Sequence, residues 1–439
     1  MKKTQFEGQS IGFWSVASIG VGGMVGGGIF AVLGFAVQLA HGATPIAFAL
    51  AGAVALVTSY SYAKLSVRYP SPGGTVEFLN RAFGPGLVTG GLNVLLWLSY
   101  IVMLSLYASA FGSYGAVFFP DAMHTIAKHG LISGIVLLLT GINVMGARIV
   151  GEYEEWIVGF KIAILVLFVT VGLASVNLDR LAPPTWSSPV QVLGGGMIIF
   201  LAYEGFELIA NTAAEVREPK TILPRAFYSS VGFVILLYVF VSTVAVGNLP
   251  VEEIVAAKDY ALAMAARPFL GAFGFTLIAI AALLSTASAI NATLYGTSRI
   301  SYIIAREGEL PKVLEKKIWK RPVEGLFITS ALTLIVANLF DLSSISMMGS
   351  AGFLILFAAV NGSNLLLRRD TGAWGWIAGL GLVVCGVALA VLIWQTAIES
   401  PRRIWVLALL VGVAFIVEAL YRKVSGRRIA PILSRGKGG

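Results

Sequence analysis

Three ionisable side chains lie within long apolar stretches of the sequence, and they are its first candidates for chemistry. Lys161 follows Ile157-Val158-Gly159-Phe160, while Glu204 and Glu207 lie three residues apart in a later stretch. A buried ammonium is costly, so Lys161 is a candidate for reversible protonation, although its long stem could instead reach a polar boundary. Two neighbouring carboxylates need a proton, a partner or a cationic ligand, although Glu207 could equally be hydrated in a vestibule.

A polar cluster lies in another apolar stretch: Ser285, Thr286, Ser288 and Asn291. Hydrogen bonds within or between helices would explain each one singly, whereas four together favour an ion or substrate contact. The three histidines are His41, His124 and His129. All three fall in loops expected on the outer side of the membrane, which disfavours a proton relay through histidine. The sequence has one cysteine and no HExxH, Walker-A or nucleophile–base pattern. We therefore expect no enzyme activity, no metal site and no cofactor apart from a coupling proton.

The element around which these residues must be arranged is the glycine-rich stretch 20–30. Six glycines between positions 20 and 28 disfavour a helix, so we expect a break there. A broken helix in a bilayer leaves backbone groups unpaired, which is tolerated only beside a cavity or ligand. A close-packing face is the alternative, but Gly26, Gly27 and Gly28 are consecutive and point about 100° apart. The formal dinucleotide pattern in 26–31 lacks a preceding strand, so we reject it.

The composition predicts a polytopic membrane protein. Of the 439 residues 57% are hydrophobic and 12% charged, and the apolar stretches are long enough for helices to cross a bilayer without the alternation of a β-barrel. No cleavage pattern follows the N-terminal lysines, so no removable signal peptide is expected. We expect twelve spans, at 11–37, 44–66, 87–118, 130–147, 155–177, 190–212, 226–247, 269–298, 324–341, 345–367, 373–396 and 403–421.

The basic residues predict the orientation of these spans in the cell membrane. With a cytoplasmic N-terminus, most of the 31 Lys and Arg residues lie inside. The exceptions outside would be Lys128, Arg180, Lys258, Arg267, Arg402 and Arg403. This distribution predicts two cytoplasmic termini, and a basic tail that lies against anionic lipid instead of nucleic acid.

A second interruption is expected near 194–207, in the sixth span. Interrupted spans at matching positions of two five-span halves are the sequence sign of an inverted-repeat transporter with a midplane binding site. A single membrane domain, 1–439, would then contain the repeats 11–177 and 190–367, with two additional helices in 373–421. The expected fold is all-α.

Several motifs resemble those of the amino acid–polyamine–organocation superfamily, and most closely its prokaryotic proton-coupled amino-acid transporters. They are the runs 26–30, 60–65, 70–74, 200–206, 215–219, 224–226 and 306–311. The resemblance covers about Phe13 to Lys423 and is specific for the family, but nearly silent on the substrate. It implies a LeuT-like fold with broken helices 1 and 6.

The resemblance also implies roles for particular residues. Lys161 matches a lysine that takes the place of sodium in sodium-coupled relatives, with Gly22, Ser285 and Ser288 as its surroundings. The implied substrate site comprises Val25, Gly26, Gly27, Gly28, Ile29, Phe200, Ala202, Tyr203, Glu204, Gly205 and Asn291. Glu204 departs from the usual apolar residue at its position, and Glu207 matches a functional glutamate of some arginine and polyamine carriers, in gating or cation contact.

The leading hypothesis is therefore a proton-coupled symporter of amino acids that works by alternating access. A carrier or exchanger of cationic amino acids or polyamines is the alternative within the same fold, because of Glu204 and Glu207. A channel or a non-transporting receptor is a distant alternative, since channels show pore-lining polar or charged rings. The expected partners are a small amino acid and the lipid bilayer.

Overall fold

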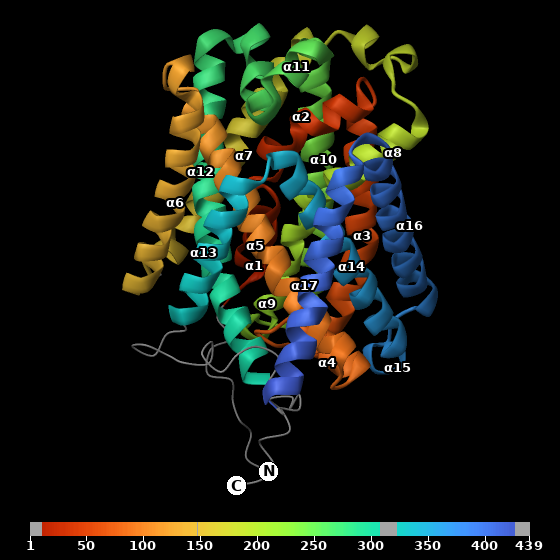
Figure 1. The fold of residues 1–439 in the computed structure, drawn as a ribbon. Helices are drawn as coiled ribbons and strands as arrows, with labels where there is room; N and C mark the ends of the chain where they lie inside the picture. The colour runs from red at the N-terminus through yellow and green to blue at the C-terminus, as the bar shows by residue number, and fades with distance from the viewer. Residues whose placement is uncertain (1–10, 147, 308–322, 426–439) are drawn as a thin grey trace.

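The protein is a bundle of long helices that run between two ends of the molecule (Figure 1). The computed structural model describes residues 11–146, 148–307 and 323–425. Its first half contains α1 (Phe13–Met24), α2 (Gly28–Ala40), α3 (Thr44–Arg68), α4 (Thr75–Phe83), α5 (Leu87–Ala116), α6 (His124–Gly146), α7 (Arg148–Gly172) and α8 (Pro189–Ile198). Its second half contains the 3-10 helix η5 (Phe200–Glu207), α9 (Leu208–Asn211), α10 (Pro219–Asn248), α11 (Val251–Ala257), the short 3-10 turn η7 (Lys258–Tyr260), α12 (Ala261–Glu307), α13 (Val323–Leu339), α14 (Leu342–Leu366), α15 (Arg368–Thr371), α16 (Gly375–Glu399) and α17 (Pro401–Ser425).

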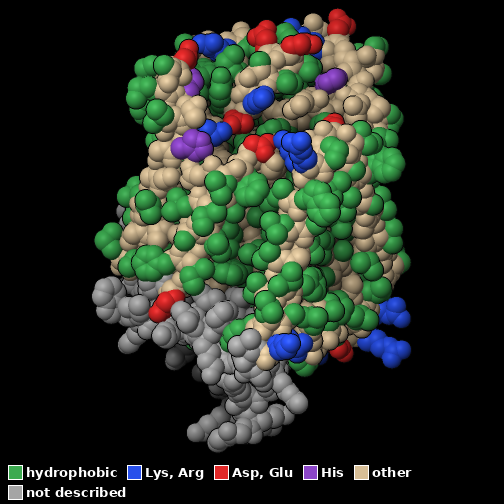
Figure 2. Space-filling model, in the orientation of Figure 1, with side chains coloured by type: hydrophobic (Ala, Val, Ile, Leu, Met, Phe, Trp, Pro, Cys, Tyr) green, Lys and Arg blue, Asp and Glu red, His purple; other side chains and the backbone are tan. Residues whose placement is uncertain are grey.

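These helices make a multi-pass membrane protein. Among the described residues, nine helices are long and apolar enough to cross a bilayer, and two bent helix pairs bring the number of spans to eleven. The 17-residue helix α13 is apolar but shorter. Figure 2 shows the charged side chains of one face mainly toward the two ends, with hydrophobic side chains covering the middle. The all-α prediction is confirmed. Of the twelve expected spans, eleven correspond to long spans among the described residues, and the shorter helix α13 lies at the position of the ninth, 324–341.

The first span is broken where the glycine-rich stretch predicted it. Helix α1 ends at Met24 and α2 begins at Gly28, with a bend of 42° between them. Only Val25, Gly26 and Gly27 separate the two helices. The break therefore lies in the middle of a membrane-spanning segment, as the sequence indicated.

The sixth span is also bent, by 41°, inside the stretch 194–207 where an interruption was expected. The glycine run Gly194–Gly196 stays helical inside α8, and the bend comes after Ile198, where the chain tightens into η5. A Cβ on Gly194 would come 2.6 Å from the Gln395 side chain, and one on Gly196 would come 2.8 Å from the Ala47 carbonyl oxygen. These glycines allow close packing of α8 on its neighbours.

Some element boundaries differ from those expected. Helix α6 begins at His124 instead of near residue 130, so His124 and His129 lie on its first turns and not in a loop. Helix α12 begins at Ala261, before the expected span 269–298, and a non-helical residue, Gly271 with φ of 62°, kinks it near the start of that span. Part of the motif 306–311 and the basic tail beyond residue 425 lie outside the described residues.

The two ends of the bundle differ in their short elements (Figure 1). Helices α4, α9 and α15 gather at one end, called the α4 end below, whereas α11 lies at the opposite end. The chain before α1 pairs with the segment before α10, because Ile11 N–H donates to the Glu215 carbonyl at 3.3 Å and Arg217 N–H to the Ile11 carbonyl at 3.0 Å. This N-terminal clasp joins the beginning of the first bent region to the segment that follows the second.

Candidate functional site

The end of α1 presents four consecutive carbonyl oxygens to four other helices. The last carbonyls of any helix lack partners within it and need other donors. In chain order these oxygens belong to Gly22, Gly23, Met24 and Val25, and they accept hydrogen bonds from Lys161, Tyr107, Tyr238 and Ser285. The donors come from α7, α5, α10 and α12, so the first break is the point where five helices meet.

The contacts of this row are of ordinary hydrogen-bond length. Lys161 Nζ lies 3.0 Å from the Gly22 oxygen, and the Tyr107 hydroxyl lies 3.3 Å from that of Gly23. The Tyr238 hydroxyl donates to Met24 at 2.7 Å, and Ser285 Oγ donates to Val25 at 2.7 Å. Three of the four donors are neutral hydroxyls, and the fourth carries the titratable amine.

Lys161 is buried in the structure, with 1% of its surface exposed. A side chain that reached the membrane boundary would expose its ammonium, so the snorkelling alternative is wrong. Close packing of α7 on α1 makes the contact possible, since a Cβ on Gly22 would lie 2.8 Å from a methyl group of Val158. The predicted proximity of Lys161 and Gly22 is thus present.

The polar cluster of α12 separates into different environments. Ser285 bonds to the first break, as above, whereas Thr286 donates to the Ala282 carbonyl of its own helix at 2.7 Å. Asn291 Oδ1 accepts from Asn143 Nδ2 of α6 at 2.8 Å, which is an interhelical contact. Ser288 is buried one turn beyond Ser285. The structure therefore places Ser285 at the break, and Asn291 against α6.

The glycines of the first break allow other chains to approach. A Cβ on Gly28 would come 2.8 Å from the Cα of Ala202, and one on Gly26 would come 2.7 Å from the Cβ of Ala289. A Cβ on Gly27 would overlap the ring of Tyr107. The two interpretations of these glycines, a helix break and a close-packing face, therefore both hold. The same glycines end the helix and allow neighbouring helices to pack closely against it.

The second break brings the two bent regions into backbone contact. A Cβ on Gly205 would overlap the backbone of Gly23 and Met24, so no side chain fits there. The Tyr238 hydroxyl lies 3.4 Å from the Ala202 carbonyl as well as 2.7 Å from that of Met24. Tyr238 therefore contacts both breaks.

Other side chains of the second break pack against the surrounding helices. Ser346 and Ser350 of α14 both donate to the Ile198 carbonyl at 2.8 Å, which satisfies the end of α8. The Phe200 ring packs on Phe357, with 5.7 Å between centroids, and the Tyr203 hydroxyl donates to the Phe48 carbonyl at 2.9 Å. The remaining residues predicted at the site, Val25, Ile29 and Ala202, are fully buried at the breaks.

Glu204 is a buried carboxylate with an unsatisfied oxygen. It is 2% exposed, and its Oε2 has no hydrogen-bond partner among the described residues. It is close enough to Tyr100, Tyr107 and Glu207 for electrostatic interaction with each. An unpaired buried carboxylate oxygen is costly, so this position suits a proton or a cationic group of a ligand.

Glu207, in contrast, accepts hydrogen bonds from three hydroxyls. Tyr100 donates to Oε1 at 2.5 Å, Thr75 donates to Oε1 at 3.2 Å, and Tyr62 lies 3.4 Å from Oε2. Glu207 is fully buried, so the alternative of a hydrated carboxylate in a vestibule is wrong in this conformation. The cluster joins η5 to α3, α4 and α5 near the α4 end.

Four further tyrosines complete the site, and the sequence did not predict them. Tyr62, Tyr100, Tyr107 and Tyr238 are all fully buried or nearly so, and each donates to a break or to Glu207. A buried tyrosine hydroxyl needs a partner, which marks such residues as important without identifying the partner. Their positions in apolar spans were the available signal.

Comparison with known proteins supports a transporter. A family model for amino acid permeases matches residues 11–415. The chain is similar to the inner membrane transport protein YbaT of Escherichia coli, with 36% identity over 90% of this chain and 93% of the relative. It is also similar to the methylthioribose transporter of Bacillus subtilis, with 25% identity over 84% and 83% of the two chains.

A plant transporter is also similar to this chain. The mitochondrial cationic amino acid transporter 3 of Arabidopsis thaliana is 27% identical over 82% of this chain and 62% of its own length. The family match covers both breaks and the helices that surround them. The chain therefore belongs to the amino acid permease family, within the amino acid–polyamine–organocation superfamily of membrane transporters.

Proposed function

We propose that the protein is a proton-coupled amino-acid symporter that works by alternating access. The observation that carries the proposal is the contact of buried Lys161 with the Gly22 carbonyl at the end of α1. Coupling requires a group that binds a proton and changes the contacts of a mobile element. Lys161 is titratable, buried and bonded to the broken helix, and so meets both requirements.

The protonation state of Lys161 would set the strength of this contact. The charged ammonium binds the partial negative charge at the C-terminal end of α1 more strongly than the neutral amine does. Loss of the proton would weaken the junction of α1 with α7, while the neutral donors Tyr107, Tyr238 and Ser285 keep their bonds. Proton release would thus favour movement of α1 relative to α7.

The substrate would bind between the two breaks. The first amides of α2, at Gly28, Ile29 and Phe30, are at the positive end of a 13-residue helix and suit a carboxylate. Ala202–Gly205 would contact the substrate amino group, next to the free oxygen of Glu204. We assign the repeats to 11–177 and 190–367, with 373–421 as additional helices, because the bends of 42° and 41° occupy matching positions.

The α4 end would face the cytoplasm in the cell membrane. Lys64, Arg68, Arg81, Arg368 and Arg369 all lie on the elements of that end. An excess of basic residues at one end of the spans favours a cytoplasmic location. Both termini would then be cytoplasmic.

Uptake by proteoliposomes tests the proposal directly. Radiolabelled amino acids are offered with an inward proton gradient, with a sodium gradient, and with neither. We expect saturable uptake that only the proton gradient drives above equilibrium, and acceleration by internal substrate. Failure of every amino acid to enter or compete would contradict an amino-acid transporter, and unsaturable conductance would indicate a channel.

A carrier of cationic amino acids or polyamines is the second candidate. The unsatisfied Oε2 of Glu204 favours it, because a substrate ammonium or guanidinium would supply the missing donor. A relative carries the name of a cationic amino acid transporter. Competition of the same uptake by neutral, cationic and polyamine compounds separates the two candidates.

A further inference from the structure

The corner between α14 and α16 contains a hollow that the transport mechanism does not use. It is shallow and open, and its lining residues are Arg368, Arg369, Ala373, Trp374, Gly375 and Trp376. Helix α14 ends at Leu366 and α16 begins at Gly375, and both are long enough to span the bilayer. The hollow, called the α15 corner below, therefore lies where two spans leave the membrane.

The α15 corner is positively charged. Arg368 and Arg369 are exposed, and among the described residues neither forms an ion pair with a carboxylate. The Arg368 guanidinium lies over the start of α16, 3.2 Å from where a Cβ of Gly375 would be. Figure 2 shows basic side chains at the lower right of the view, over this corner. Two guanidinium groups without a carboxylate partner suit a phosphate.

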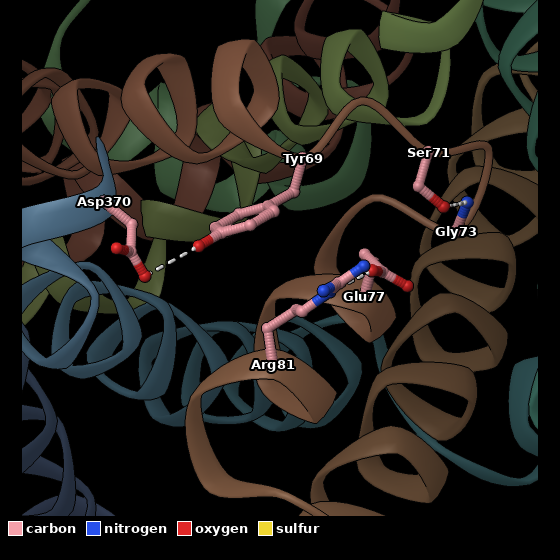
Figure 3. A network of polar contacts seen from close by, with 6 residues as sticks. All are labelled: Tyr69, Ser71, Gly73, Glu77, Arg81 and Asp370. Carbon is pink, nitrogen blue, oxygen red and sulfur yellow. Dashed lines mark hydrogen bonds and ion pairs between the residues drawn. The ribbon is translucent and has the colours of Figure 1, made fainter. Parts of the chain in front are cut away.

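The acidic residue of α15 is engaged elsewhere. The Tyr69 hydroxyl donates to Asp370 Oδ2 at 3.3 Å, as Figure 3 shows. The Tyr69 ring also lies 5.2 Å from the Arg81 guanidinium, which pairs with Glu77 at 2.6 Å. Asp370 is therefore held toward α3 and α4.

The beginning of α16 adds to the positive potential. The amides of Gly375 and Trp376 precede the first intrahelical bond, which Ile377 N–H makes to the Trp374 carbonyl. Such amides at the start of a 25-residue helix attract an anion. The guanidinium groups and the helix start are thus at the same hollow.

Apolar side chains continue from this corner along α16. Trp374 and Trp376 stack with 6.4 Å between centroids and are 65% and 68% exposed. Val383 and Val387 are exposed farther along the same helix. Exposed tryptophans are typical of the boundary between headgroups and acyl chains.

We propose that the α15 corner binds the phosphate headgroup of an anionic phospholipid, whose acyl chains lie against Trp374, Trp376 and the exposed face of α16. The charge of the hollow selects an anion, and the adjoining apolar face selects a lipid over a free phosphate. The proposal depends on neither the substrate nor the coupling ion of the transporter.

The bound lipid would also stabilise the end of α3. Trp374 N–H donates to the Tyr60 hydroxyl at 2.7 Å, and Lys64 Nζ donates to the Gly372 carbonyl at 3.3 Å. Both Tyr60 and Lys64 belong to α3, which also carries Tyr62 beside Glu207. A lipid that orders the corner therefore favours the arrangement in which the Glu207 cluster is formed.

Lipid binding by native mass spectrometry tests the proposal. The whole protein in a neutral detergent is titrated with phosphatidylglycerol, with phosphatidylcholine and, separately, with inorganic phosphate as competitor. The test variant is Arg368→Gln with Arg369→Gln. The control, Arg217→Gln with Arg402→Gln, removes the same charge from two exposed positions elsewhere.

We expect the wild type to bind one phosphatidylglycerol molecule tightly. The test variant should bind it roughly 10- to 30-fold more weakly, because each basic residue contributes about 1 kcal/mol to the binding of an anionic lipid. The control variant should bind as the wild type does, and thermal unfolding without lipid should be unchanged in both. The proposal would be overturned if the test variant bound phosphatidylglycerol as tightly as the wild type, or if the control variant lost as much affinity as the test variant. It would also be overturned if the wild type bound phosphatidylcholine as tightly as phosphatidylglycerol, or if inorganic phosphate displaced the lipid at lipid-like concentrations.

Discussion

The two breaks bend their spans by almost the same angle, 42° and 41°, yet they are built differently. At the first, the helix stops at Met24, and its last carbonyls are satisfied by side chains of four other helices. At the second, only Ile199 separates α8 from the eight-residue 3-10 helix η5, which carries Glu204 and Glu207. The first break offers backbone groups, and the second offers carboxylates.

This difference shows that a bend in a membrane helix has no single cause. Glycine at 26–28 accompanies a real end of the helix, whereas glycine at 194–196 remains helical and admits close neighbours. The first break should therefore be sensitive to added side-chain volume, and the second to removal of charge. The predictions below test this distinction.

The largest effect is expected for Gly28→Val. The new side chain would meet the backbone of Ala202, 2.8 Å from its Cβ position, and would separate the breaks. Overpacking of this kind costs about 1–3 kcal/mol, and uptake should fall to background with loss of substrate binding. Gly27→Val should behave in the same way, because of Tyr107. Calorimetric substrate affinity and thermal unfolding measure both effects.

Gly379→Val is the matched control, since a Cβ at Gly379 meets no atom within 4 Å. It should retain affinity and uptake. Unchanged substrate affinity in Gly27→Val and Gly28→Val would show that the first break is a packing feature and that the site lies elsewhere.

Lys161→Ala should abolish proton-driven accumulation while the protein remains folded. The substitution removes the titratable donor to Gly22, and it relieves a costly buried charge, so stability should be kept. Counterflow, which needs no gradient, should be retained at least in part. Uptake is measured with and without a proton gradient across a pH series, with Lys220→Ala, an exposed position, as control. Wild-type accumulation and pH dependence in Lys161→Ala would show that the proton binds elsewhere.

Glu204→Gln should separate substrates by charge. If the free Oε2 binds a cationic substrate group, the variant should lose about 1.5–3 kcal/mol of affinity for cationic substrates, roughly 10- to 150-fold, and much less for neutral ones. Competition constants for matched neutral and cationic amino acids measure the difference. Equal loss for both classes, or none, would eliminate the cationic and polyamine alternative.

Tyr238→Phe should have the smallest effect. It keeps the ring that packs on Tyr203 and Phe48, and it removes the hydroxyl that contacts Met24 and Ala202. Loss of one neutral hydrogen bond costs about 0.5–1.5 kcal/mol, visible as a modest fall in thermal stability and transport rate. Ser242→Ala, whose hydroxyl bonds within α10, is the control. Identical transport rates in Tyr238→Phe and wild type would show that the two breaks are coupled by backbone packing alone.

The sequence predicted the helices and the first break better than it predicted the contacts between helices. Long apolar stretches determine spans, and six glycines near residue 25 indicated the first break, because these are local properties of the chain. The contact of Lys161 with Gly22 was anticipated through family resemblance and not from spacing. Ser285 was anticipated near the first break in the same way. Tyr107 and Tyr238 could not be predicted, since they meet α1 only after packing of helices distant in sequence.

The second break shows the same limit. Glu204 and Glu207 were identified by their type and position, but their opposite environments were not. Glu207 obtains three hydroxyl donors from α3, α4 and α5, and Glu204 keeps a free oxygen. Three residues of sequence separation cannot reveal which of two carboxylates faces such donors.

The N-terminal clasp has a consequence for the resting distribution of the carrier. Its two backbone hydrogen bonds, between Ile11 and the segment Glu215–Arg217, must break before the start of α1 can move away from the start of α10. At about 0.5–1.5 kcal/mol each, they bias the empty molecule toward the clasped state by a factor of roughly 5 to 150. An unloaded carrier would then open at this end in only a small fraction of molecules. In the proton-coupled cycle proposed above, such a bias would limit futile cycling, in which protons cross the membrane without cargo.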